Sequence, residues 1–183
     1  MKATLTRYAR SQGGYTLVEL IVASAIGLMV MTGLTSVVLT TWRAGTTATS
    51  RVEASEQIRN FEFEAYDDFA LSNLPIPTGC PATVASPCTS PIVLQGSQAS
   101  NATTPTISPY RVTYTWDGVG VLQRQAQVGT NPAVTFDAAT GVTAFSWYLD
   151  GSGPNQTVVV TISITVQSYT ETQTLRFYPR VNP

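Results

Sequence analysis

The chain has 183 residues, of which 43% are hydrophobic and 11% charged, with a formal net charge of −1 and no histidine. This length suits one hydrophobic core, and the charge excludes a global basic field that would attract nucleic acid. Without histidine or a nucleophile motif, acid–base catalysis would depend on carboxylates alone. We therefore predict a protein that is not an enzyme and needs no cofactor or metal.

The N-terminal segment, residues 1–14, is basic. It carries Lys2, Arg7 and Arg10 and no acidic residue. The uncharged apolar run Leu20–Leu39 follows, and its 20 residues suffice to cross a hydrocarbon core of about 30 Å. Positive charge before a membrane span favours a cytoplasmic N-terminus. The sequence thus predicts a membrane helix with the rest of the chain outside the cytoplasm.

Two glycines, Gly13 and Gly14, stand before the apolar run. A secretory signal peptide has its small-residue cleavage site after the apolar region, so this order is reversed. Glycine also leaves the backbone open enough to enter a protease in an extended form. A cut after Gly14 would remove the leader, residues 1–14, and retain the helix.

The order of a basic leader, Gly14, the aromatic Tyr15 and then Thr-Leu-Val-Glu19 ahead of an apolar helix resembles the type IV prepilin family. The resemblance covers about residues 7–42, with Tyr15 where the family usually has phenylalanine. It implies cleavage between Gly14 and Tyr15 by a membrane prepilin peptidase, then N-methylation of the new Tyr15 amine. It also implies an α+β, type IV pilin-like fold.

Glu19 is a lone carboxylate at the edge of the apolar run. A carboxylate in a bilayer costs about 2.5–3.5 kcal/mol and usually has a functional partner. After cleavage the Tyr15 amine is a nearby cation. We expect Glu19 to pair with it, either one turn away in the same helix or on a neighbouring subunit, where the pair would set subunit register. The alternative is a Glu19 solvated in the headgroup layer.

The helix is expected to continue beyond the membrane. Its apolar positions, Ala54, Ile58, Phe61, Ala65 and Phe69, follow the spacing of one helical face. Because no proline occurs before Pro75, one helix of about 55 residues is allowed, from Tyr15 to near Ser72. Many major pilins have a proline in the membrane half, and its absence disfavours a bulk filament subunit. The nearby acidic residues are expected to form a solvated face: Glu62, Glu64, Asp67 and Asp68.

Residues 75–109 are rich in proline, serine and threonine and nearly uncharged, which predicts an extended surface loop. Cys80 and Cys88 lie within it. Since this segment is expected outside the cytoplasm, a disulfide between them is predicted. A zinc site is the rival interpretation, but it would need carboxylate ligands in a chain without histidine.

Beyond Pro109 the hydrophobic pattern takes a period of two, which is typical of strands. Strands are predicted at 110–116, 119–127, 142–149, 157–167 and 170–178. Packing one apolar sheet face on the helix gives an α+β head at 43–183, after the assembly helix at 15–42. The turn at 150–155 superficially offers calcium ligands, but it lacks the order of an EF-hand loop and is interpreted as a plain turn.

Two functions of different classes remain open. The first is a minor pilin or pseudopilin that starts or caps a type IV pilus or a type II secretion pseudopilus, resembling W-type minor pilins and J-type pseudopilins. The second is a pilus subunit whose head receives DNA or a surface ligand through a patch of Arg111, Arg124, Arg176 and Arg180; scattered solvated arginines are the alternative to such a patch. The net charge does not support nucleic acid as a partner.

The resemblance implies several partners: other pilin or pseudopilin subunits, the prepilin peptidase and methylase, an inner-membrane assembly platform and membrane lipid. The implied location is the bacterial inner membrane, and after assembly a filament in the periplasm or at the cell surface.

Overall fold

The computed structural model describes residues 14–77, 79–99, 107–153 and 156–180. Most of the expected leader, the end of the turn at 150–155 and part of the expected loop at 75–109 lie outside these residues. The chain divides into two compact units, residues 1–45 and 46–183. Its elements are α1 (Leu17–Leu71), β1 (Ile92–Ala99), β2 (Ile107–Trp116), β3 (Val121–Val128), β4 (Val134–Thr140), β5 (Val142–Asp150), β6 (Thr157–Val166) and β7 (Tyr169–Phe177).

Helix α1 has 55 residues, which confirms the predicted single long helix. Every described side chain of the first unit, from Gly14 to Gly45, is exposed. By length and composition, α1 is the one helix in the described part of the chain that is long and apolar enough to cross a membrane. Such a surface suits lipid or other helices better than water.

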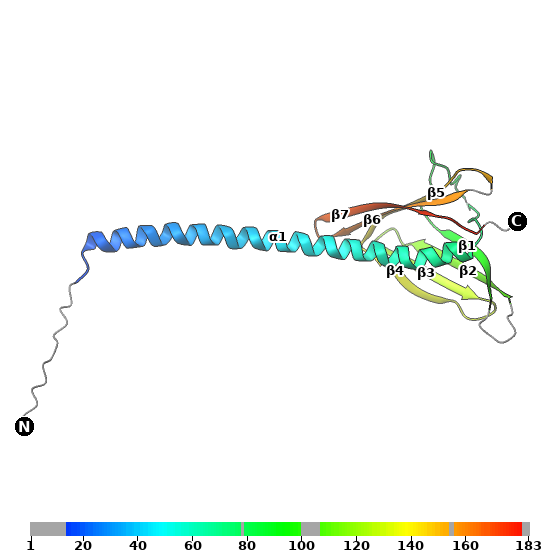
Figure 1. Ribbon diagram of the computed structural model, residues 1–183, viewed down its shortest axis with the longest axis horizontal. Helices are drawn as coiled ribbons and strands as arrows, with labels where there is room; N and C mark the ends of the chain where they lie inside the picture. The colour runs from blue at the N-terminus through cyan, green and yellow to red at the C-terminus, as the bar shows by residue number, and fades with distance from the viewer. Residues whose placement is uncertain (1–13, 78, 100–106, 154–155, 181–183) are drawn as a thin grey trace, which may run out of the picture. The chain divides into compact units, whose positions relative to one another are not determined.

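In the second unit, one face of α1 enters the core. Ala54, Ile58, Phe61, Ala65 and Phe69 are all buried, as their spacing predicted. The ring of Phe61 packs edge-on against Tyr114, Phe145 and Phe177, which come from β2, β5 and β7. Aromatic contacts of this geometry add to the burial of apolar area. This part of α1 therefore packs against both sheets (Figure 1).

The strands form two antiparallel sheets, ordered β1-β2-β3-β4 and β5-β6-β7. The predicted α+β packing of antiparallel strands on the helix is thus confirmed, with two sheets instead of one. The chain leaves the first sheet at Gly141, between β4 and β5, where φ is +72°. A β-carbon there would lie 2.9 Å from the Thr165 carbonyl oxygen, so glycine fits this sharp passage between sheets.

Two strands differ from the sequence-based prediction. β1 lies inside the segment expected to be a loop, with only Ile92 and Leu94 fully buried. β4 was missed because most of its side chains are exposed and show little alternation. The five predicted strands are all found, with shifts of one to three residues at their ends. β2 and β3 pair as a hairpin, and β5, β6 and β7 form a meander.

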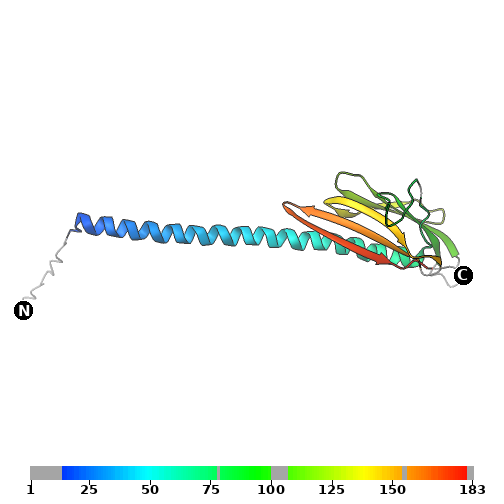
Figure 2. The ribbon, with the colours of Figure 1, turned by 90° about the horizontal axis from the view of Figure 1, so that it is seen from above.

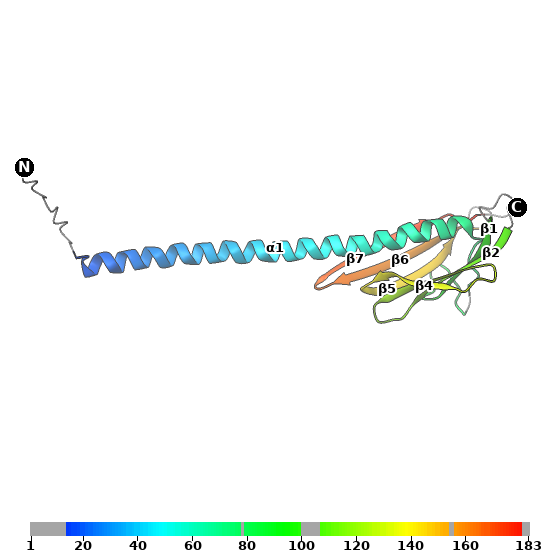
Figure 3. The same ribbon diagram turned by 90° about the horizontal axis from the view of Figure 1, so that it is seen from below.

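β7 runs beside the second part of α1 (Figures 2 and 3). The rings of Phe69 and Phe177 stack there with centroids 4.4 Å apart. At the end of the helix, Asn73 N donates to the Gln95 carbonyl of β1 over 2.8 Å. The end of α1 thus contacts both sheets, β7 through the aromatic stack and β1 through this hydrogen bond.

Cys80 and Cys88 are joined by a disulfide, with their Cα atoms 5.6 Å apart. Beyond it, the backbone of Cys88 exchanges hydrogen bonds of 2.7 and 2.8 Å with that of Trp147 in β5. The Leu149 amide donates to Ala82 of the same loop over 2.9 Å. The disulfide loop therefore covers the outer edge of β5, which would otherwise expose unpaired backbone groups.

Candidate functional site at the start of the helix

Thr16 is the N-cap of α1. Its Oγ1 accepts a hydrogen bond of 3.3 Å from the Glu19 amide, and its carbonyl accepts one of 3.2 Å from the Leu20 amide. A threonine followed three residues later by glutamate is the capping-box pattern. The capping role of Thr16 was not predicted above, although the spacing Thr16-Leu17-Val18-Glu19 indicates it.

Glu19 lies in the first turn of the helix, exposed among the exposed side chains of Leu17, Val18 and Leu20. A carboxylate there interacts favourably with the positive end of the helix dipole. No other acidic residue occurs before Glu53. The start of the helix therefore combines a single carboxylate with a mostly apolar exposed surface.

Tyr15 precedes the cap and lies outside the helix, with an exposed ring. Thr16 caps the helix, so the helical backbone of α1 begins after Tyr15 and does not include it. The Tyr15 nitrogen is also part of the peptide bond to Gly14, so an amine at this position requires cleavage. The geometry leaves the Glu19 carboxylate free of a contact to Tyr15 and open to an approaching group.

A second polar site lies in the head, around Asp68. This carboxylate is 1% exposed, so the prediction that it belongs to a solvated face was wrong. Arg124 of β3 binds it through Nε and Nη2, each at 2.6 Å. The hydroxyls of Tyr110 and Tyr114 donate to its two oxygens. All the oxygens of a buried acid are thereby satisfied, as burial of a charge requires.

The two tyrosines of this cluster hold their protons tightly. Burial, and then the neighbouring Asp68 carboxylate, raise the pKa of both Tyr110 and Tyr114. Hydrogen bonding to Asp68 likewise raises the pKa of Arg124, whose guanidinium lies over the Phe136 ring at 5.0 Å. The cluster fixes α1 to the first sheet and presents no free group for chemistry.

Three of the four arginines proposed as a ligand patch can be placed by their strands and partners: Arg111, Arg124 and Arg176. Arg124 is bound to Asp68, and Arg111, an odd number of positions from Tyr110 and Tyr114 along β2, lies on the opposite face of the sheet. Arg176 of β7 pairs with Asp150 at 2.6 Å, an exposed contact. Arg111 and Arg124 thus lie on opposite faces of the first sheet and Arg176 belongs to the second sheet, so the structure does not bring these three arginines together.

Within the described residues, no group of three or more His, Cys, Asp or Glu side chains converges as metal ligands.

Asp117 has a structural role in a turn. Its carboxylate accepts hydrogen bonds from the amides of Val119, Gly120 and Val121. These bonds, that to Gly120 first, lower its pKa. The side chain thus closes the turn between β2 and β3.

The family model described as the prokaryotic N-terminal methylation motif matches residues 9–35. These residues include Gly14, Tyr15, Thr16 and Glu19 and the first part of α1. No curated protein and no solved structure matches the chain.

An apolar, capped N-terminal helix packed on antiparallel sheets defines a helix-anchored α+β protein of the type IV pilin-like fold. The methylation motif at residues 9–35 supports a type IV prepilin-like family and a subunit of the pilin or pseudopilin kind. Such subunits are structural rather than enzymatic. The motif implies processing by the prepilin peptidase and assembly with other pilin subunits from the membrane.

Proposed function

We propose that this chain is a minor subunit that helps to start or cap a type IV pilus or a type II secretion pseudopilus. Residues 1–14 are the leader that the peptidase removes. Residues 15–42 hold the protein in the inner membrane and later pack into the filament. Residues 43–183 form the head outside the cytoplasm.

The observation that carries the proposal is the helix start. A lone carboxylate, Glu19, sits one turn inside a capped helix whose described side chains are all exposed up to Gly45. Cleavage after Gly14 would create a cation two residues ahead of the Leu17 start of α1. Because Tyr15 is outside the helix, a neighbouring subunit's Tyr15 amine is the better partner for Glu19. Opposite charges in a low dielectric attract strongly, so the pair would set the register between subunits.

A minor role is supported by the membrane half of the helix. No proline interrupts it, and α1 runs without a break from Leu17 to Leu71. Among the described residues, Arg124 and Arg176 are each paired with a carboxylate, so they do not support a DNA receptor. The initiating or capping position is part of the proposal.

Replacement of Glu19 by alanine tests the assembly role. We expect Glu19→Ala to enter the membrane normally and its content in sheared filaments to fall at least about tenfold, equivalent to ~1.4 kcal/mol. The control is Glu53→Ala, which removes an exposed carboxylate outside the apolar segment. Quantitative immunoblots of membranes and filaments measure both. Equal filament content for the two variants would refute the pairing role.

A further inference from the structure

The first sheet has an outer face that is turned away from the core of the head. Val112 and Tyr114 of β2 are fully buried, so strand alternation places Arg111 on the other face of the sheet, where it is exposed. The pairing of β2 with its two neighbours puts Gln95 of β1 and Gln127 of β3 directly opposite Arg111. One guanidinium is thus flanked on both sides by a side-chain amide.

Three hollows on this outer face meet at Arg111, which lines each of them. One of about 200 Å³ extends over β2 and β3, and one of about 300 Å³ extends over β1 to the chain that follows α1. The third, of about 290 Å³, lies beside Gln95 and Gln127. We call this surface, centred on Arg111 and lined by Asn73, Gln95, Thr113, Gln125 and Gln127, the Arg111 face.

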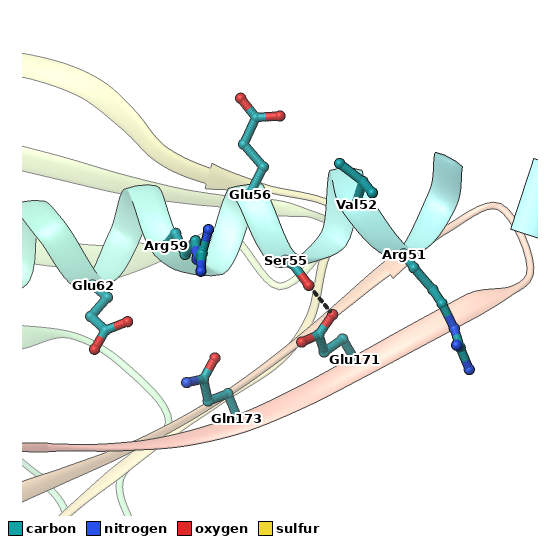
Figure 4. A pocket seen from close by; sticks show the side chains of 8 residues that line it. All are labelled: Arg51, Val52, Ser55, Glu56, Arg59, Glu62, Glu171 and Gln173. Carbon is teal, nitrogen blue, oxygen red and sulfur yellow. Dashed lines mark hydrogen bonds between the residues drawn. The ribbon is translucent and has the colours of Figure 1, made fainter. Parts of the chain in front are cut away.

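The Arg111 face carries a positive charge that nothing in the described head neutralises. Among the described residues, no carboxylate lines any of the three hollows and no ion pair includes Arg111. Arg124 and Arg176, by contrast, each bind a carboxylate at 2.6 Å. The larger hollow between α1 and β7 also differs, because its two arginines, Arg51 and Arg59, stand among three glutamates (Figure 4). The Arg111 guanidinium is therefore open to an anion.

The groups that surround this guanidinium are neutral and can form hydrogen bonds. Gln95 and Gln125 are exposed, and Gln127 uses its Nε2 to donate to the Asn131 carbonyl over 3.2 Å. A side-chain amide both donates and accepts hydrogen bonds, and a sugar hydroxyl does the same. The row from Gln95 through Arg111 to Gln127 crosses two strand spacings, a length of about 10 Å that suits a disaccharide.

We propose that the Arg111 face binds an acidic polysaccharide, one whose sugar units carry carboxylates. The carboxylate of one sugar unit pairs with the guanidinium of Arg111, which favours two parallel hydrogen bonds to such a group. The hydroxyls of this unit and the next bond to the amides of Gln95 and Gln127. The proposal goes beyond the proposed function and does not depend on it, because it uses neither the membrane helix nor a filament.

The single charge separates this ligand from other anionic polymers. A nucleic acid carries a phosphate at every nucleotide, and its binding strengthens with the number of cations that neutralise them, whereas the Arg111 face has one arginine. An acidic peptide would satisfy Arg111 but would bring few hydroxyls to the surrounding amides. A uronate polymer supplies both the carboxylate and the hydroxyls.

Isothermal titration calorimetry of the full-length protein in detergent tests the proposal. The probes are oligomers of galacturonate, alginate and hyaluronan, and the matched control is the methyl ester of the galacturonate oligomer, which keeps the hydroxyls and loses the charge. We expect at least one uronate oligomer to bind with a Kd below about 1 mM. If galacturonate is that ligand, its ester should bind at least about tenfold more weakly. Failure of all three oligomers to bind would overturn the proposal.

Variants locate the binding on this face. Arg111→Gln should weaken binding at least about tenfold and Arg111→Lys less, because lysine keeps the charge without the fork. Arg176→Gln, which removes an exposed arginine of the second sheet, should leave binding unchanged. Melting temperatures equal to that of the wild type show that each variant is folded. Equal affinities of Arg111→Gln and Arg176→Gln would contradict the proposal, as would binding of polyglutamate or single-stranded DNA as tight as that of the uronate oligomer.

Discussion

Among single residues, Asp68 shows that the burial of a carboxylate on a helix depends on its hydrogen-bond partners. It continues the series Ala54, Ile58, Phe61 and Ala65 with a step of three, so helical geometry places it on the buried face. An isolated carboxylate there would be prohibitively unfavourable. Arg124 and two tyrosine hydroxyls make the position stable, and they join α1 to the first sheet.

Removing this carboxylate should be costly. We expect Asp68→Ala to reduce the free energy of unfolding by about 3–5 kcal/mol, because Arg124 and two tyrosine hydroxyls lose their partner in the interior. Asp67→Ala is the matched control, since Asp67 is exposed, and should stay within about 0.5 kcal/mol of the wild type. Denaturant unfolding of the full-length protein in detergent measures both. Similar losses for the two variants would show that the cluster does not stabilise the head.

The same cluster predicts an alkaline limit to stability. Tyr110 and Tyr114 have a pKa raised above the ordinary value of 10.0, so the folded state keeps protons that the unfolded state has lost. The contribution of these two tyrosines to the free energy of unfolding is then fully present below about pH 10 and falls as the pH rises above it. Melting temperature measured against pH should show this fall. Tyr114→Phe should reduce its slope and Tyr66→Phe, at an exposed site, should not; equal slopes in both variants would contradict the assignment.

At the level of elements, the long helix and its two sheets differ in how far the sequence determines them. The helix was predictable because no proline interrupts it, its first part is a continuous apolar run and its second part has apolar residues at the spacing of one helical face. β1 and β4 were not, because each is an edge strand with few buried side chains. Their positions depend on pairing with the neighbouring strands β2 and β3. The mostly exposed side chains of β1 and β4 give little hydrophobic pattern that would indicate this pairing.

The contact between the end of α1 and β1 is unusually close. A β-carbon at Gly96 would lie 2.2 Å from the Leu71 carbonyl oxygen, so glycine is required for this approach. Gly96→Ala should therefore destabilise the head by about 1–3 kcal/mol. Gly120→Ala is the control, because nothing lies within 4 Å of a β-carbon there. Thermal unfolding compares the two, and an unchanged melting temperature for Gly96→Ala would contradict the close packing described.

Only part of the candidate site could be predicted from the sequence, for a physical reason. Gly14, Tyr15 and Glu19 form a local pattern that a linear sequence displays directly. The Asp68–Arg124 pair joins residues 56 positions apart, and the separation of Arg111 from Arg124 depends on strand register. Neither follows from local sequence, and the same holds for the Arg111 face, which forms only when β1, β2 and β3 pair.

In the whole molecule, the two units have different roles. The first supplies the methylation motif and an exposed apolar helix, and the second a head with its own core. A motif of this kind implies a protein that is inserted in the membrane, cut and then assembled with other subunits. The individual role of the chain is expected to reside in the surface of its head.

The mass of the protein recovered from sheared filaments tests the central claim most directly. Intact and peptide mass spectrometry should show a chain that starts at Tyr15 and carries one methyl group on its amine. Gly14→Ala, which places a side chain at the predicted cleavage site, should accumulate in the membrane with residues 1–14 still attached. Wild-type protein present in filaments with an intact N-terminus at Met1 would contradict the account.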